Sequence, residues 1–147
     1  MIYTKERANQ FTVFISACRA DKADQVETRT NELRAWLKEY PAHVGFCTEE
    51  VTGVYREAGA PKATYEHTFK VECEDIMQVQ RVCRYATFVF EQECILVVNS
   101  QTHTAFLMTL DDAGFKTMPL NGTMQPVDCF YGECGTIDST GQLWEVR

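Results

Sequence analysis

Apolar and polar positions alternate along the chain in two rhythms, one typical of strands and one of amphipathic helices. Residues 11–19 are rich in β-branched and aromatic side chains, which predicts a strand. From Asp21 to Tyr40, apolar residues recur at three- and four-residue steps, and Pro41 follows. This pattern predicts a helix that Asp21 caps and whose charged face points outward.

The middle of the chain repeats the pattern with two strands before the helix. Residues 44–57 and 63–73 alternate as strands do, and the Gly59-Ala60-Pro61 turn between them favours a hairpin. A second apolar stripe predicts a helix over residues 74–91. The continuous apolar run of residues 94–99 then predicts a strand covered on at least one face.

The last third of the chain predicts two small hairpins and a loop. Residues 104–110 and 115–119 form the first hairpin, a loop follows, and residues 136–146 form the second. The order β-α-β-β-α-β with further strands is typical of a ferredoxin-like, split βαβ antiparallel sheet with two helices on one face. The free face of that sheet needs cover from the C-terminal strands or from a subunit partner.

Composition agrees with one folded domain over residues 1–147. The chain is 45% hydrophobic and carries a net charge of −7. This acidity disfavours binding to nucleic acid and to anionic membranes, and it favours either a cationic ligand or plain solubility. No apolar stretch reaches the length of a membrane span, and the N-terminus lacks a secretory segment, so we expect a cytoplasmic protein.

The usual signatures of catalytic and metal sites are missing. The seven cysteines include no Cys-x-x-Cys pair, and several have apolar neighbours, as in Phe46-Cys47, Val82-Cys83 and Cys94-Ile95. They therefore predict reduced core residues and no metal site. No phosphate-binding glycine loop and no Gly-x-Ser-x-Gly elbow occurs. Nucleophilic catalysis by the protein is therefore unsupported by the sequence.

Polar residues gather instead at the ends of the predicted elements. Carboxylates at Glu91 and Glu93 close the second helix, where they face the negative end of its dipole at a cost of roughly 0.3–1 kcal/mol each. Ligand binding and a solvated turn are both open explanations. The other clusters are Tyr55-Arg56-Glu57-Ala58, Tyr65-Glu66-His67-Thr68 and Ser100-Gln101-Thr102-His103-Thr104.

These clusters carry a resemblance over the whole length to the phage enzymes that destroy S-adenosylmethionine (SAM), known first as SAM hydrolases and now as SAM lyases. The Ser-Gln-Thr-His-Thr-Ala string is its most specific part. The motifs that resemble the family are Met1-Ile2-Tyr3-Thr4-Lys5-Glu6, Tyr55-Arg56-Glu57-Ala58, Glu91-Gln92-Glu93-Cys94, Ser100-Gln101-Thr102-His103-Thr104-Ala105, Thr136-Ile137-Asp138 and Gly141-Gln142-Leu143-Trp144-Glu145-Val146.

The resemblance implies a PII-like homotrimer of ferredoxin-like subunits that bind SAM between neighbours. It implies cleavage of SAM to 5′-methylthioadenosine and L-homoserine lactone without a cofactor, in the host cytoplasm, against SAM-dependent restriction and methylation. Tyr55 and Glu66 are the implied catalytic residues and Glu91 binds substrate, with Gln101 and His103 as further candidates for the pocket wall.

The substrate explains why a catalytic signature is not needed. The carboxylate of SAM can attack its own Cγ, and the sulfonium is a good leaving group, so the enzyme has to fold the substrate and strip water from it. We expect Glu66 to hold the cationic part, Glu91 the ribose hydroxyls, and Tyr55 the amino-acid part or the sulfonium. Three alternatives stay open: a water-using SAM hydrolase, a non-catalytic PII-like nucleotide-binding module, and a protein that binds a host enzyme.

Overall fold

The computed structural model describes residues 9–56, 61–132 and 134–147. The opening motif and the turn residues Gly59 and Ala60 lie outside this part of the chain. The elements are, in chain order, β1 (Phe11–Ile15), the 3-10 helix η1 (Ala20–Gln25), α1 (Val26–Glu39), α2 (Pro41–Val44), β2 (Phe46–Tyr55), β3 (Thr64–Cys73), α3 (Ile76–Phe90), β4 (Ile95–Asn99), β5 (Thr104–Asp111), β6 (Gly114–Val127), β7 (Cys134–Ile137) and β8 (Leu143–Val146).

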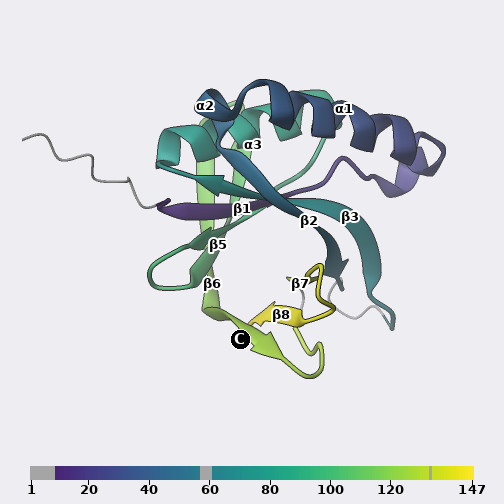
Figure 1. Cartoon of the computed structure of the whole chain (residues 1–147), viewed down its shortest axis with the longest axis vertical. Coiled ribbons are helices and arrows are strands. Elements are labelled where there is room, and N and C mark those ends of the chain that lie inside the picture. Colours follow the sequence, from purple (N-terminus) through teal and green to yellow (C-terminus); the bar gives the residue numbers. More distant parts are fainter. Residues whose placement is uncertain (1–8, 57–60, 133) are drawn as a thin grey trace, which may run out of the picture.

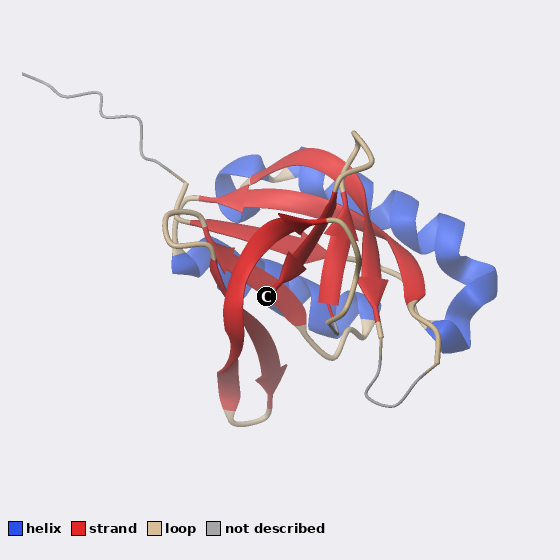
Figure 2. Ribbon diagram, turned by 90° about the horizontal axis from the view of Figure 1, so that it is seen from below, coloured by secondary structure: helices blue, strands red, loops and turns tan. Residues whose placement is uncertain are grey.

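The strands form a closed antiparallel barrel in the order β1-β3-β2-β7-β8-β6-β5-β4. Seen from below, the strands curve around one another and the helices lie behind them (Figure 2). The predicted ferredoxin-like sheet is therefore wrong, because its edges are not free. On one side β5 pairs with β4, and on the other β7 pairs with β2, with Thr52 opposite Ile137.

The long strand β6 makes this closure possible. It pairs with β5 as far as Thr123 and then with β8, where Met124 lies opposite Val146. The sequence predicts a strand end at Pro119 and a loop beyond it, whereas the strand continues to Val127. Pro119 is tolerated opposite Phe106, beside a register shift in the ladder, where the pattern of hydrogen bonds is already interrupted.

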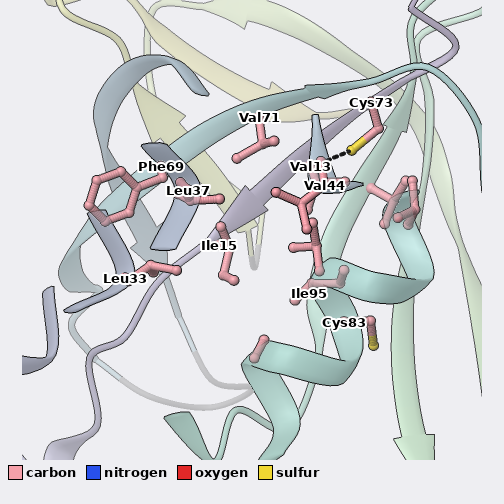
Figure 3. Close-up of a cluster of buried hydrophobic side chains, with 14 of the residues drawn as sticks. Val13, Ile15, Leu33, Leu37, Val44, Phe69, Val71, Cys73, Cys83 and Ile95 are labelled. Atoms are coloured by element: carbon pink, nitrogen blue, oxygen red, sulfur yellow. Dashed lines mark hydrogen bonds between the residues drawn. The ribbon is translucent and has the colours of Figure 1, made fainter. Parts of the chain in front are cut away.

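The main core lies outside the barrel, between its wall and the helices, which lie together above β1 and β3 in Figure 1. Val13 and Val71 from the wall meet Leu33 of α1 and Val82 of α3, all fully buried. Figure 3 shows this cluster, including the thiol of Cys73, which donates to the Val44 carbonyl at 3.4 Å. Within the described residues, no helix is long and apolar enough to cross a membrane.

Alternation along each strand sends the other side chains into the lumen of the barrel. Phe14, Val51, Leu96 and Val98 form a second apolar cluster there. Because residues two apart share a face of a strand, Ser16 also points to the lumen side, as Phe14 does. The lumen, lined by residues from both halves of the chain, is the concave part of the molecule where a site can be built.

Candidate active site

Tyr55 and Glu66 come together at one end of the lumen. Gly53 of β2 pairs with Glu66 of β3, and Tyr55 lies two residues further along β2. Tyr55 lies on the same face of β2 as Val51, which belongs to the lumen cluster. Glu66 lies on the face of β3 opposite to that of Phe69, a residue of the core outside the barrel, so it also faces the lumen. Diagonal neighbours of this kind are within reach of long and aromatic side chains.

A glycine beside this pair leaves room for it. A methyl group on Gly53 would lie 2.5 Å from the hydroxyl oxygen of Thr68 and 3.1 Å from the Tyr55 ring. Thr68 is fully buried, so its side chain has little freedom to move away. Any side chain larger than hydrogen at position 53 would therefore clash with Thr68 and crowd the Tyr55 ring.

Burial sets the protonation of both side chains. Loss of water raises the pKa of the Tyr55 phenol, and the neighbouring Glu66 carboxylate raises it further, so the hydroxyl stays a donor. Burial also raises the pKa of Glu66, an effect that a hydrogen bond with Ser16 partly opposes. A carboxylate that is incompletely satisfied in a dry place attracts a cation.

Cysteines surround this pair, which the sequence did not predict. Of the seven, Cys73 and Cys83 are buried core residues as expected, whereas Cys18 and Cys134 are half-buried and Cys94 is exposed. Cys134 pairs with Tyr55 across β7 and β2. Although Cys94 is exposed as a whole residue, partial shielding of its thiol from water raises its pKa, and the charges of Glu93 and Glu66 add to this effect. Cys18, Cys94 and Cys134 each stand next to a charged residue in the sequence, but so do Cys73 and Cys83, so the sequence gave no signal that separated these thiols from core cysteines.

Glu91 lies where α3 ends, near the end of β1 and just before the start of β4, and it lies at the surface. It ends α3 in the left-handed conformation, with φ of 56°, and its carboxylate accepts from Lys22 Nζ at 2.5 Å. The Lys22 hydrogen bond is the largest cause of its lowered pKa, and the charges of Arg19 and Arg29 add to it. These cations offset the repulsion between Glu91 and the negative end of the helix dipole, so the ionised side chain is stabilised without a ligand.

Arg29 is the buried residue that fixes this corner. Its Nε donates to the Ala17 carbonyl at 2.8 Å and its Nη2 to the Phe90 carbonyl at 2.5 Å, while Nη1 lies 3.8 Å from the Glu91 carboxylate. It thus ties the end of β1 to the end of α3. The sequence analysis missed it, although a basic residue beside Thr30 and Leu33 on the apolar stripe was a signal.

Gln101 and His103 lie elsewhere. They follow β4 whereas Glu91 precedes it, and five strand residues span about 16 Å. Gln101 is an exposed turn residue whose backbone N–H donates to the Asn99 side-chain oxygen at 2.9 Å. His103, with φ of 62°, borders a cavity in the lumen together with Glu72 and Ser100. The structure therefore groups Tyr55, Glu66 and Glu91 at one end and separates the other two.

Among the described residues, no group of three His, Cys, Asp or Glu side chains could hold a metal ion.

Comparison with known proteins shows which family this chain resembles. The sequence profile of the S-adenosylmethionine lyase family matches residues 13–147. The chain is also 38% identical over 152 residues to the S-adenosylmethionine lyase of Enterobacteria phage T3, with 100% of both chains covered. The chain therefore belongs to the S-adenosylmethionine lyase family.

Proposed function

We propose that this protein cleaves SAM to 5′-methylthioadenosine and L-homoserine lactone beside Tyr55 and Glu66. The observation that carries the proposal is the position of these two side chains in a member of this family. A neutral phenol and a carboxylate with a raised pKa face the same lumen from neighbouring strands. Together they offer a hydrogen-bond donor, an aromatic face and a negative charge to a cationic substrate.

The reaction needs no group from the protein to form or break a bond. An oxygen of the substrate carboxylate bonds to Cγ as the Cγ–S bond breaks, and the electron pair of that bond goes to sulfur. The sulfonium becomes a neutral thioether and the amino acid closes to a lactone. The protein has to hold the chain folded with the carboxylate near Cγ, an effect that reaches roughly 7–11 kcal/mol in well-oriented systems.

Each side chain then has a distinct task. Glu66 binds the ammonium group or the sulfonium region, because its carboxylate is half-buried and, among the described residues, a single hydrogen bond with Ser16 opposes its desolvation. Tyr55 orients the amino-acid part or covers the sulfonium with its ring. Glu91 binds ribose hydroxyls only after its ion pair with Lys22 breaks. Lys22→Gln should therefore lower the KM for SAM or leave it unchanged, and should not raise it.

Gln101 and His103 would join this site only from another copy of the chain, because β4 separates them from Glu91. The homotrimer with sites between subunits, which the resemblance implies, remains a prediction. Sedimentation equilibrium measures the number of subunits. Mixing inactive Glu66→Gln subunits with inactive His103→Ala subunits then restores activity if the two residues meet across an interface, and does not if they act within one chain.

Two other functions compete with the lyase. A SAM hydrolase would deliver water to Cγ and release homoserine directly, with a glutamate as general base. A binding module would hold SAM without turnover. Incubation of the purified protein with SAM and detection of methylthioadenosine by mass spectrometry excludes the binding module. If the lyase is correct, removal of host SAM, and with it SAM-dependent restriction, is the role we propose in infection.

A further inference from the structure

Ser16 is a buried hydroxyl residue on the lumen side of the chain, directly after β1. It is only 5% exposed. In the ladder between β1 and β3, Ile15 lies opposite Phe69. Continuation of this register brings Ser16 level with Thr68 and makes it a diagonal neighbour of Glu66 on the lumen side. A glutamate side chain is long enough to span such a diagonal, so the fold brings this hydroxyl within reach of the Glu66 carboxylate.

The Ser16 hydroxyl is bonded on one side by the backbone and has one hydrogen to give on the other. The N–H of Cys18 donates to Ser16 Oγ at 3.0 Å. The Glu66 carboxylate is the second hydrogen-bond partner of this hydroxyl. An ionised carboxylate only accepts, so Ser16 is the donor in this pair. Ser16 thus lies in a short chain of hydrogen bonds that runs from the Cys18 N–H to Glu66.

Thr68 is closer to Glu66 in sequence, but its hydroxyl serves a different acceptor. Thr68 is fully buried, and its Oγ1 donates to the backbone carbonyl of Glu66 at 3.2 Å. Its hydrogen is therefore not available to the carboxylate. The two carboxylate oxygens offer about four acceptor positions. Among the residues that the structure describes, Ser16 fills one of these positions, and the others are left for a cationic ligand.

The two residues after Ser16 are held by side chains from the helical layer. Arg29 of α1 donates from Nε to the Ala17 carbonyl at 2.8 Å. Gln92, which follows α3, donates from Nε2 to the Cys18 carbonyl at 3.0 Å. These contacts fix the backbone that supplies the N–H for Ser16, so the fold sets the position of this hydroxyl.

We propose that Ser16 is a positioning residue, which holds the Glu66 carboxylate ionised and directed at the cationic part of SAM. The inference rests on the proposed function, and Ser16 acts through Glu66 and not on the reacting atoms. A neutral hydroxyl suits this task, because it stabilises the carboxylate with one hydrogen bond and leaves the negative charge uncompensated. A lysine or arginine in the same place would form an ion pair that competes with the substrate cation.

The titration of the Glu66 side-chain carboxyl carbon, followed by NMR, is the first readout, because it does not require turnover. Glu66→Gln identifies the signal by its loss. The carboxylates that follow α3, Glu91 and Glu93, are exposed and give signals of their own. The other titratable groups at this end of the lumen are a phenol and three thiols, namely Tyr55 of β2, Cys134 of β7, Cys18 after β1 and Cys94 before β4. A phenol and thiols keep their protons in the acid range, so they do not change the charge around Glu66 there.

Ser16→Ala removes the donor. We expect the Glu66 titration and the acidic limb of kcat/KM to move to higher pH, because the ionised carboxylate loses its hydrogen bond. On that limb, kcat/KM for SAM should be about tenfold lower than in the parent protein. Ser16→Thr keeps a hydroxyl and should restore both. Thr12→Ala is the matched control and should change neither, since the Thr12 hydroxyl donates from the same side of β1 to a different carboxylate, that of Glu72, at 2.8 Å.

The role of Ser16 and the proposed function fail in different ways. The role of Ser16 is overturned if the Glu66 titration in Ser16→Ala matches that of the parent protein, if Thr12→Ala moves it as far, or if Ser16→Thr titrates like Ser16→Ala. It is also overturned if Ser16→Ala lowers kcat/KM as much in the Glu66→Gln background as in the parent protein. A parent protein that releases no methylthioadenosine from SAM would instead contradict the proposed function.

Discussion

Tyr55 and Glu66 lie diagonally across the β2–β3 ladder, with Gly53 directly opposite Glu66, and both face the barrel lumen. Burial, followed by the charge of Glu66, raises the pKa of the Tyr55 phenol, and burial raises the pKa of Glu66. This arrangement is unfavourable for an empty protein, because the half-buried Glu66 charge has lost part of its solvation. It becomes favourable when a cation binds, and the first predictions follow from that balance.

Replacing Glu66 by glutamine should lower activity and raise stability together. The lost charge should reduce kcat/KM for SAM by about a hundredfold or more, as for other buried groups that stabilise charge. The free energy of unfolding at pH 7 should increase, because the folded state no longer holds an ionised, half-buried carboxylate. Activity assays and urea denaturation measure the two effects. Glu39→Gln, at an exposed position, should change neither.

The pH dependence of catalysis should report Glu66 directly. Its folded pKa lies above the ordinary value of 4.5, so protonation, and loss of the charge that binds SAM, begins at a higher pH than for an exposed glutamate. The acidic limb should be clear in kcat/KM, which follows the free enzyme, and should move to lower pH in kcat, because bound SAM favours the ionised form. A limb that persists unchanged in Glu66→Gln would assign it to another group.

A methyl group at position 53 should displace the side chains of Thr68 and Tyr55. Gly53→Ala puts a carbon 2.5 Å from the Thr68 hydroxyl, and we expect a loss of about 1–3 kcal/mol in unfolding free energy together with lower activity. Adding Thr68→Ala removes the clashing oxygen and should restore part of both. If Gly53→Ala is as stable and active as the parent, the tight contact does not matter.

Arg29→Lys should loosen the corner that carries Glu91. The lysine keeps the charge but cannot donate to the carbonyls of both Ala17 and Phe90 from one planar group, so we expect about 1.5–3 kcal/mol lower stability. Lys22→Gln is the matched control, because the Lys22–Glu91 pair is exposed and should contribute little. Thermal or urea unfolding checks both, and equal effects would contradict the role of Arg29.

Helices α1 and α3 and the first four strands were visible in the sequence because each has a local cause, whereas the 3-10 helix η1 and the short helix α2 were not predicted. Asp75 accepts from the Gln78 amide and starts α3, and the apolar stripe of α3 continues to Phe90. The barrel was not predictable from such patterns. Its closure depends on β7 meeting β2 and on β6 changing partners at Thr123, and these contacts between distant segments leave no periodic trace.

The geometry of the candidate site was predictable only where its residues are local in sequence. Tyr55 and Glu66 lie on a hairpin, so their sequence spacing fixes their approach. Gln101 and His103 stand near Glu91 in sequence, but β4 runs between them and carries them to the other end of the lumen. The place of Arg29 on an apolar stripe signalled its burial, but its carbonyl partners and the pairing of Cys134 with Tyr55 depend on contacts between distant segments.

The most direct test of the central claim is the reaction in water enriched in ¹⁸O. The account predicts methylthioadenosine with an unlabelled homoserine lactone as the first product, since both lactone oxygens come from the substrate. Homoserine formed later by lactone hydrolysis should carry the label in its carboxyl group. Label in the γ-hydroxyl from the earliest time point would show that water attacks Cγ, and absence of methylthioadenosine would show that the protein does not cleave SAM.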